Sequence, residues 1–440
     1  RDFCLSRGLG DVYKRQIPMS APVVCSVAAP QAGAATGSTS TRERTVPPRL
    51  MDVGGPCVGV DASGRPVRLD GRHLWGGVAV VGAAGTGKSV LLRALFGWLL
   101  VHRERHPETA ALVVETKPDG LTSYEAVARA AGHADEVLVV EVADPASPAI
   151  DMFARPGDDP LTRAAFVADT WAAAFGDGAI MGRSREVISA VVAAGLVLDE
   201  RAFDAYDRGR AGGSGAEPLP ERSWFWAGAV LAGRMGEVSG QALVACLHEQ
   251  AVRQGEESWA ARALAGLSII WGPQVSAAAR RGLTEAARNK FDQLRETAGF
   301  LAPAGRNAVT WDESISGFHV TVLGTGPARR GGGQLTGAAS QWLTAMAGYT
   351  MRSAVERSCF GWAGAGREVA VLCDEFKAFA GWAPAAARWW KDDGRSYGVL
   401  PWFATQYLEQ LRAIDPTLLT SFLSYQTFIS LRQDDVAAAE

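Results

Sequence analysis

The sequence predicts an α/β protein in which a mostly parallel sheet is interrupted by an inserted all-α subdomain. A glycine-rich loop joins one apolar run, Val78–Val81, to a second at residues 90–101. Strand-like and helix-like patterns then alternate as far as Glu141, which is typical of a parallel sheet with helical crossovers. Between residues 151 and about 312 the apolar residues recur every three or four positions, which indicates helices.

Composition places the chain among ordinary globular proteins of two or three domains. It has 440 residues, 48% of them hydrophobic, and a formal net charge of −3, so any grip on nucleic acid must come from local basic patches. The six cysteines include no Cys-x-x-Cys pair and the six histidines are dispersed. This pattern argues against a zinc site and a disulfide framework and suits a reducing cytoplasm. No apolar run approaches the ~20 residues that cross a bilayer.

The N-terminal region is not expected to belong to the fold. Residues 1–16 have no structural period and resemble translated sequencing-adapter read-through, so we treat them as a non-native segment. Residues 17–55 are dominated by Ala, Pro, Ser, Thr and Gly, which predicts a disordered lead-in. We therefore expect any membrane attachment to come from a missing segment or from a partner.

Ordered structure is expected from residue 56. Residues 58–60 and 65–69 alternate apolar and polar side chains about a turn at 61–64, which predicts a β-hairpin. The glycine-rich loop follows, with the Gly-x4-Gly-Lys-Ser spacing of a loop that cradles phosphates on backbone N–H groups at a helix N-terminus. Lys88 would reach the β- and γ-phosphates of ATP, and the Ser89 hydroxyl would bind Mg²⁺. The other candidate nucleotide-binding residues of this loop are Gly82, Gly85, Thr86 and Gly87. The alternative is a glycine-rich turn beside a surface lysine.

The next strands extend the sheet. Residues 110–115 form a buried-type strand that ends at the segment 116–120, a helix is predicted at 123–131, and a third strand at 136–141. Parallel sheets bind ligands beyond the carboxyl ends of their strands. Lys88 and Lys117 both lie at such ends, so Lys117 is a further candidate for the nucleotide site.

The inserted segment has helical periodicity and two groups of basic residues. Helices are predicted at 161–175, 186–197, 226–235, 241–253, 258–270 and 273–297, with a flexible gap at 208–215. Either a polyanion or solvent could face the basic residues, and the solvated alternative is favoured. These residues are Arg183, Arg185, Arg280, Arg281, Arg288, Lys290 and Arg295.

The α/β pattern resumes at residues 318–323 and continues through a loop with Arg329 and Arg330 into a helix at about 341–355. His319 opens this strand and is interpreted as a core histidine rather than a metal ligand. A strand at 369–373 then ends in two adjacent carboxylates. Asp374 suits Mg²⁺, and Glu375 suits a base that orients the attacking water; the alternative is a solvated acidic turn.

Two further candidates flank the strand at 399–403. Gln406 follows its carboxyl end and could sense the γ-phosphate, while Arg395 precedes it and could reach the phosphate of a neighbouring subunit. The alternatives are a capping glutamine and a surface arginine. Pro401 is awkward in a central strand because proline removes a ladder hydrogen bond. A last strand is predicted at 425–431, ending at Arg432.

The segments GAAGTGKS, ETKPDG, VLCDEF and GRSYGVLPWFATQ, in this order, resemble the FtsK/HerA class of motor ATPases. Within that class the chain is most similar to the type IV coupling proteins of bacterial conjugation. The second strand of the family typically ends in Asp-Pro-Lys-Gly. Here Lys117 matches the lysine of that motif, and Glu115 stands in place of its aspartate. The resemblance also assigns the γ-phosphate glutamine to Gln406 and the trans-acting arginine to Arg395.

The resemblance implies a RecA-like core in two halves. Residues 56–150 would carry the hairpin and Walker A motif, 151–316 the all-α subdomain facing the relaxase-bound substrate, and 317–440 the Walker B and glutamine motifs. It further implies a homo-hexamer with ATP and Mg²⁺ at subunit interfaces and DNA in the central channel. Relaxase or secretion-channel proteins would be partners, and the protein would act in the cytoplasm at the inner face of the cell membrane.

The function expected from these observations is ATP hydrolysis coupled to DNA translocation in conjugation or type IV secretion. Three alternatives are weighed against it. The first is a secretion ATPase that moves protein, and the second is a nucleotide-dependent scaffold with little turnover. The third, a small-molecule kinase, is disfavoured by the long insertion and the late acidic strand.

Overall fold

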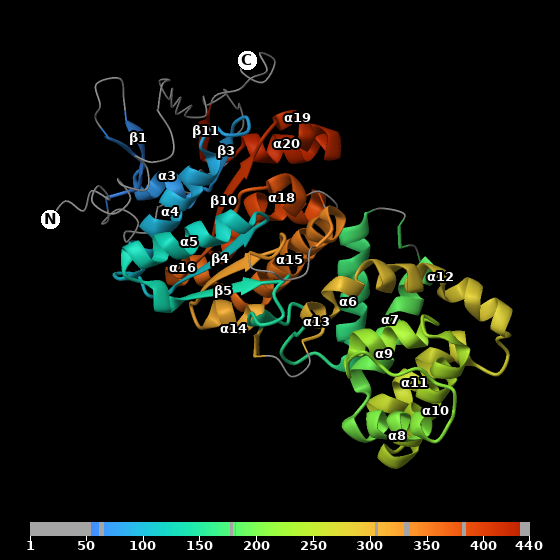
Figure 1. The fold of residues 1–440 in the computed structure, drawn as a ribbon. Coiled ribbons are helices and arrows are strands. Elements are labelled where there is room, and N and C mark those ends of the chain that lie inside the picture. Colours follow the sequence, from blue (N-terminus) through green and yellow to red (C-terminus); the bar gives the residue numbers. More distant parts are fainter. Residues whose placement is uncertain are drawn as a thin grey trace. The chain divides into compact units, whose positions relative to one another are not determined.

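The computed structural model describes residues 54–60, 66–176, 179–180, 182–303, 307–329, 335–380 and 384–431, which form two compact units (Figure 1). Unit 1 comprises the described residues within Arg1–Val140, Glu313–Arg329 and Arg352–Glu440, and unit 2 those within Glu141–Asp312 and Arg330–Met351. The predicted segment 1–16, almost all of the lead-in 17–55, the hairpin turn 61–64, Arg330 and Arg432 lie outside the described residues. No helix in the described ranges is long and apolar enough to span a bilayer.

Unit 1 is built on a seven-stranded sheet with the order β11-β3-β10-β9-β4-β8-β5. The pairs from β11 to β8 are parallel, and β4, β9 and β10 are buried along their whole length. Such strands read as continuous apolar runs because helices cover both faces. The predicted α/β core with a mostly parallel sheet and an inserted helical subdomain is confirmed, although the subdomain also contains one short strand pair. The strands are β3 (Val78–Val81), β4 (Thr109–Glu115), β5 (Val137–Glu141), β8 (Val320–Gly324), β9 (Glu368–Cys373), β10 (Val399–Thr405) and β11 (Thr427–Ser430).

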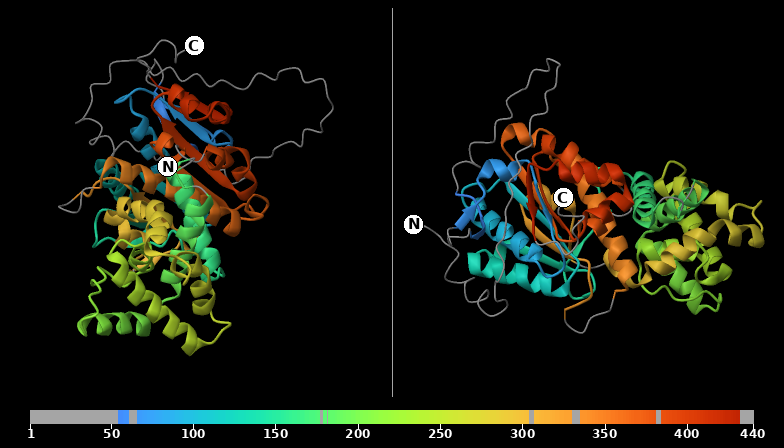
Figure 2. Two further views of the ribbon diagram at one scale, coloured as in Figure 1. Left: turned by 90° about the vertical axis from the view of Figure 1, so that its right-hand side faces the viewer. Right: turned by 90° about the horizontal axis from the view of Figure 1, so that it is seen from above.

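Helices pack on both faces of this sheet (Figure 2). On one face α4 (Lys88–Arg103) and α5 (Pro118–Ala131) bury their apolar sides against the strands, with Phe96 and Tyr124 in edge-to-face contact. On the other face Phe403 of β10 stacks on Phe376 of α17 (Phe376–Ala380), which also contacts Phe422. Alternate side chains of one strand therefore serve two cores.

Several short elements complete unit 1. They are β1 (Cys57–Val60), antiparallel to β2 (Pro66–Arg68), α3 (Gly71–Trp75), η1 (Ala134–Glu136), α16 (Trp362–Ala365), α18 (Pro384–Asp392), η3 (Gly394–Tyr397), α19 (Leu408–Ile414) and α20 (Pro416–Leu423). Helix α14 (Trp311–Ser316) and helix α15 (Gly337–Ser358) each contribute residues to both units.

The structure corrects three local expectations in unit 1. Helix α5 begins at Pro118 rather than at 123, with proline in its first turn, where the missing N–H costs nothing. His319 is exposed and precedes β8, so it is not a core residue. Pro401 lies inside β10, and its carbonyl oxygen faces Gly77, which precedes β3. The pairing of β10 with β3 begins only at the next residue, Trp402, so the missing N–H of Pro401 removes no ladder hydrogen bond to β3.

Unit 2 is mainly helical. Its helices are α6 (Pro160–Phe175), α7 (Gly182–Val197), α8 (Glu200–Ala211), α9 (Trp224–Leu231), α10 (Gly236–Gln254), α11 (Trp259–Trp271), α12 (Ala277–Gln293), η2 (Arg295–Thr297) and α13 (Ala298–Leu301). The predicted gap at 208–215 is wrong at its start, because residues 208–211 complete α8. Two short parallel strands, β6 (Ala149–Ile150) and β7 (Ala308–Val309), also interrupt the helices.

Helix starts and aromatic packing explain why unit 2 folds. Asp159, Asp199, Ser258 and Ser276 each accept a backbone N–H at the start of a helix, which satisfies donors that the helix itself leaves unpaired. Behind these caps Trp171 contacts Phe225 and Phe291 in a buried aromatic core. Capping and burial together stabilise a bundle that helix propensity alone would not hold.

Candidate functional site

The loop between β3 and α4 has a shape that only glycine allows at two positions. Gly85 and Gly87 have φ angles of 76° and 102°, and Gly87 is the N-cap of α4. A larger residue would not fit at Gly82, because its Cβ would lie 2.6 Å from Thr86 Oγ1. That hydroxyl is held in place, since it donates to the Ala83 carbonyl oxygen at 2.8 Å. The first N–H groups of any α-helix have no partner within the helix, so a loop that leads into the start of α4 is suited to an anion.

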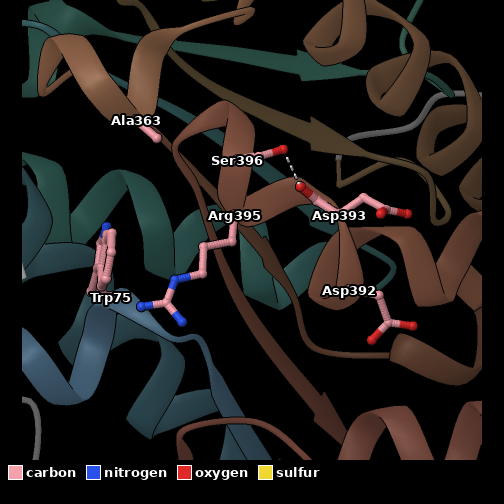
Figure 3. Close-up of a pocket in the computed structure, with 6 residues that line it drawn as sticks. All are labelled: Trp75, Ala363, Asp392, Asp393, Arg395 and Ser396. Atoms are coloured by element: carbon pink, nitrogen blue, oxygen red, sulfur yellow. Dashed lines mark hydrogen bonds between the residues drawn. The ribbon is translucent and has the colours of Figure 1, made fainter. Parts of the chain in front are cut away.

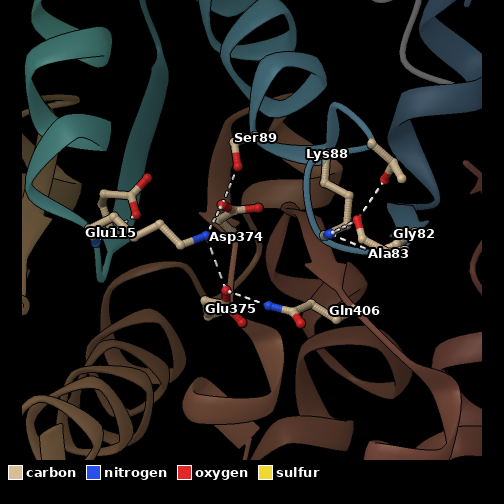
Figure 4. Close-up of polar contacts among 10 residues, drawn as sticks. Gly82, Ala83, Lys88, Ser89, Glu115, Asp374, Glu375 and Gln406 are labelled. Atoms are coloured by element: carbon tan, nitrogen blue, oxygen red, sulfur yellow. Dashed lines mark hydrogen bonds and ion pairs between the residues drawn. The ribbon is translucent and has the colours of Figure 1, made fainter.

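Lys88 lies inside this loop (Figure 4). Its Nζ donates to the carbonyl oxygens of Gly82 at 2.6 Å and Ala83 at 2.9 Å, and only 7% of the residue is exposed. Burial lowers the pKa of this ammonium, although the charges of Asp374 and Glu375 act in the opposite direction. Two carbonyl hydrogen bonds thus hold the ammonium within the loop, and the oxygens of a phosphate, which carry negative charge, would be stronger acceptors for it.

Asp374 connects the loop to the far part of the chain. It follows β9, and its Oδ2 accepts from Ser89 Oγ at 2.5 Å and from Lys117 Nζ at 3.3 Å. The residue is 2% exposed, and its Oδ1 has no hydrogen-bond partner within the described residues. A buried carboxylate oxygen without a partner is costly, and a cation at that position would satisfy it.

These oxygens fit Mg²⁺. The cation usually takes one or two protein oxygens, substrate phosphates and water rather than a complete cage of side chains. The Ser89 hydroxyl and Asp374 supply two such oxygens in contact with each other, next to the phosphate loop. In the described part of the chain, no three or more His, Cys, Asp or Glu residues are grouped so that they could hold a metal ion by themselves.

Glu375 and Gln406 meet beside this pair. The Gln406 Nε2 donates to Glu375 Oε1 at 3.3 Å, and Lys117 Nζ lies 3.1 Å from the same oxygen. Burial opposes the charge on Lys117, but Asp374 and Glu375 outweigh it and raise the pKa of this ammonium. Three adjacent strand ends, those of β4, β9 and β10, therefore place a cation, two carboxylates and an amide around one point.

Glu115 is a buried acid at the edge of this site. It is 1% exposed, its Oε1 accepts from the Lys117 backbone N–H at 2.9 Å, and a Cβ at Gly120 would lie 2.2 Å from its Oε2. Burial and then the charge of Asp374 raise its pKa to about 7. The sequence showed the substitution at this position but not that the carboxyl group would be enclosed.

This raised pKa predicts a pH-dependent stability. The folded state holds the Glu115 proton more tightly than the unfolded chain, so its contribution is full below about pH 4.5 and is lost as the pH rises through about 7. The loss amounts to about 3 kcal/mol of unfolding free energy. Glu115→Gln keeps an oxygen for the Lys117 amide and should be more stable than the native protein at pH 8 and similar at pH 5. Urea unfolding at both values measures this, and equal pH slopes in the two proteins would contradict it.

Arg395 does not join the group. It lies in η3, before β10, whereas the other candidates lie after the carboxyl ends of the strands. The seven residues of β10 span roughly 20 Å, far more than an arginine side chain can bridge. Within one subunit the structure therefore brings together Lys88, Ser89, Lys117, Asp374, Glu375 and Gln406 and leaves Arg395 at the opposite edge of the sheet.

Several basic residues of unit 2 have structural partners. Arg185 pairs with Asp169, and Arg280 pairs with Glu237 while its guanidinium lies 4.0 Å from the centre of the Trp271 ring. Lys290 Nζ lies 4.2 Å from the centre of the Phe175 ring, and burial lowers its pKa. These contacts reduce the positive charge that the two groups can offer a polyanion.

No family model matches the chain, and no curated protein matches it. Among solved structures, the unbound "Bacterial conjugative coupling protein TrwBdeltaN70" is 14% identical with a TM-score of 0.43, covering 84% of this chain and 70% of that one. TrwB "in complex with ADP and Mg2+" is 14% identical with a TM-score of 0.43, covering 84% and 74%. TrwB with a non-hydrolysable ATP analogue is 13% identical with a TM-score of 0.46, covering 84% and 74%.

Proposed function

We propose that this chain is a Mg²⁺-dependent ATPase of the FtsK/HerA class that moves DNA. The observation that carries the ATPase proposal is the contact between Ser89 and Asp374, 285 residues apart. It joins a phosphate loop to an acidic strand end whose second carboxylate touches a lysine and a glutamine. A surface turn or a solvated acidic pair would not bury Asp374 to 2% exposure.

The proposed chemistry assigns one task to each group. Lys88 would exchange the carbonyls of Gly82 and Ala83 for the β- and γ-phosphates of ATP, while the N–H groups of the loop hold the β-phosphate. Mg²⁺, held by Ser89 and Asp374, supplies charge neutralisation when it is bound. Glu375 would orient the attacking water and accept its proton.

Gln406 and Lys117 would act beside Glu375. The Gln406 amide donates to the carboxylate at 3.3 Å, which would place it to sense the γ-phosphate beside Glu375. Lys117 would hold the two carboxylates in place, because its ammonium forms ion pairs with both Asp374 and Glu375. Arg395 would supply positive charge to the transition state in an adjacent subunit, as an arginine finger does.

DNA transport rests on the order of the motifs and on the large helical insertion. In this proposal the active form is a homo-hexamer with DNA in its channel, and relaxase or secretion-channel proteins are its partners. Transport of protein is the second candidate, because Arg185 and Arg280 are already paired and the chain carries a net charge of −3. A scaffold without turnover is the third, and the position of Glu375 beside Lys117 and Gln406 argues against it.

Turnover with and without DNA separates these candidates. We expect DNA to raise the rate of ATP hydrolysis by the purified chain, and the DNA concentration giving half the effect to rise between about 50 mM and about 200 mM salt. The measurement is phosphate release with duplex and with single-stranded DNA. Hydrolysis that DNA leaves unchanged would favour protein transport, and no hydrolysis at all would favour a scaffold.

A further inference from the structure

An open cavity of about 400 Å³ at the surface of unit 1 is lined by residues other than those that meet around Asp374 (Figure 3). Arg395 extends across it toward Trp75, and its Cζ atom lies 3.9 Å from the centre of the indole ring. The other lining residues are Ala363, Asp392, Asp393 and Ser396. The cavity therefore contains one guanidinium, one aromatic face and two carboxylates.

The backbone that carries Trp75 is tied to the sheet on both sides. The carbonyl of His73 accepts from Thr427 Oγ1 at 2.6 Å, and that of Leu74 accepts from Trp402 Nε1 at 3.4 Å. The Gly76 carbonyl accepts from the Gln426 N–H at 3.4 Å. Hydrogen bonds from β10, from β11 and from the residue preceding β11 thus hold the end of α3, so the backbone that carries the indole ring is fixed.

The backbone that carries Arg395 is also held. Gly398 has a φ angle of 80°, its N–H donates to the Arg395 carbonyl at 3.1 Å, and its own carbonyl accepts from Val369 at 3.0 Å. Another residue at Gly398 would be strained, and its Cβ would lie 2.5 Å from the Arg367 carbonyl. With both backbones fixed, the direction of the guanidinium depends on what its side chain packs against.

We propose that Trp75 is a positioning residue that aims Arg395 at the nucleotide site of an adjacent copy of this chain. This inference rests on the proposed function. Arg395 lies roughly 20 Å along β10 from the proposed nucleotide site of its own subunit, so it could reach only the nucleotide site of another subunit. A guanidinium packed on an aromatic face keeps its N–H groups directed outward in its plane, suited to phosphate oxygens. Without the ring, Asp392 and Asp393 of the same cavity compete for the charge.

A subunit-mixing experiment tests this role. Donor subunits carry Lys88→Ala and keep Arg395, while acceptor subunits carry Arg395→Ala and keep Lys88. Each alone should hydrolyse ATP poorly, and the mixture should recover turnover at donor–acceptor boundaries. Adding Trp75→Leu to the donor should lower the recovered kcat about tenfold with KM for ATP unchanged, because a displaced arginine loses its alignment. Trp75→Phe, which retains an aromatic face, should stay within about twofold.

Placing the substitution in the donor or in the acceptor distinguishes orientation of Arg395 by Trp75 from a purely structural role of Trp75. Trp75→Leu in the acceptor should cost clearly less than in the donor, because the acceptor has no arginine to aim. Trp75→Met provides a second replacement without a ring, and the thermal midpoint of each variant is measured. Equal losses in donor and acceptor, an unchanged donor, or a rise in turnover would overturn the proposal. If the native protein hydrolyses ATP but mixing recovers no turnover, Arg395 does not act in an adjacent subunit. This inference would then fail, while the proposed ATPase activity would remain. If the native protein does not hydrolyse ATP, both proposals fail.

Discussion

Glu375→Gln is expected to lower ATP turnover by about 10²- to 10⁴-fold, the usual contribution of a general base. The amide keeps the size of the side chain and can still accept from Gln406 Nε2, which lies 3.3 Å from Glu375 Oε1 in the native protein. It cannot accept a proton from water. Nucleotide binding should persist, because the phosphate loop and Asp374 are unchanged. Phosphate release measures turnover, and a fluorescent ATP analogue measures binding.

Glu409→Gln is the matched control. Glu409 lies in α19 with 64% of its side chain exposed, paired only with a neighbouring arginine on the same helix among the contacts described. The same chemical change there should leave turnover within about twofold, because exposed ion pairs contribute little. If the two substitutions had equal effects, or if Glu375→Gln lost binding together with turnover, Glu375 would not be the base.

Lys88→Ala is expected to lower turnover by about 10²- to 10³-fold and to weaken ATP binding as well. The ammonium is the positive group within the loop itself, so its loss affects both the bound state and the transition state. Folding should change little. The carbonyls of Gly82 and Ala83 lose a donor, but the cost of burying an ammonium disappears with it.

Lys377→Ala serves as the control for removing a lysine. Lys377 is exposed on α17, two residues after Glu375. Its loss should leave both the ATP affinity and the turnover near native values. Isothermal titration with ATP and Mg²⁺ reports affinity, and thermal unfolding reports folding of each variant. Native affinity in Lys88→Ala would show that the Lys88 ammonium does not bind the phosphates.

Much of the site could be anticipated from sequence because its parts are local. The spacing of Gly82, Gly85, Gly87 and Lys88 is a requirement of one turn and one helix start, and both are encoded by adjacent residues. Asp374 follows a short run of apolar residues of the kind typical of a buried strand, and the structure has a strand there. Parallel strands end at a common edge, so their terminal side chains could be expected to meet.

Other features depend on contacts that no local pattern encodes. Lys117 bridges Asp374 and Glu375, and Glu115 is enclosed beneath Gly120, because β4 pairs with β9 although their sequences are far apart. The predicted strand at 318–323 included His319, whereas β8 begins one residue later, at Val320, and leaves the histidine exposed. The aromatic partner of Arg395 is Trp75, more than 300 residues earlier, so spacing gives no signal for it.

Sequence by itself determined the class of fold, the glycine-rich loop, the acidic strand end and the residue types at the strand ends, since these follow from short-range backbone and periodicity requirements. Only the tertiary structure decided which charges face one another, which carboxyl group is buried, and on which edge of the sheet the arginine lies. Those outcomes depend on strand order and side-chain packing, which arise from contacts between residues distant along the chain.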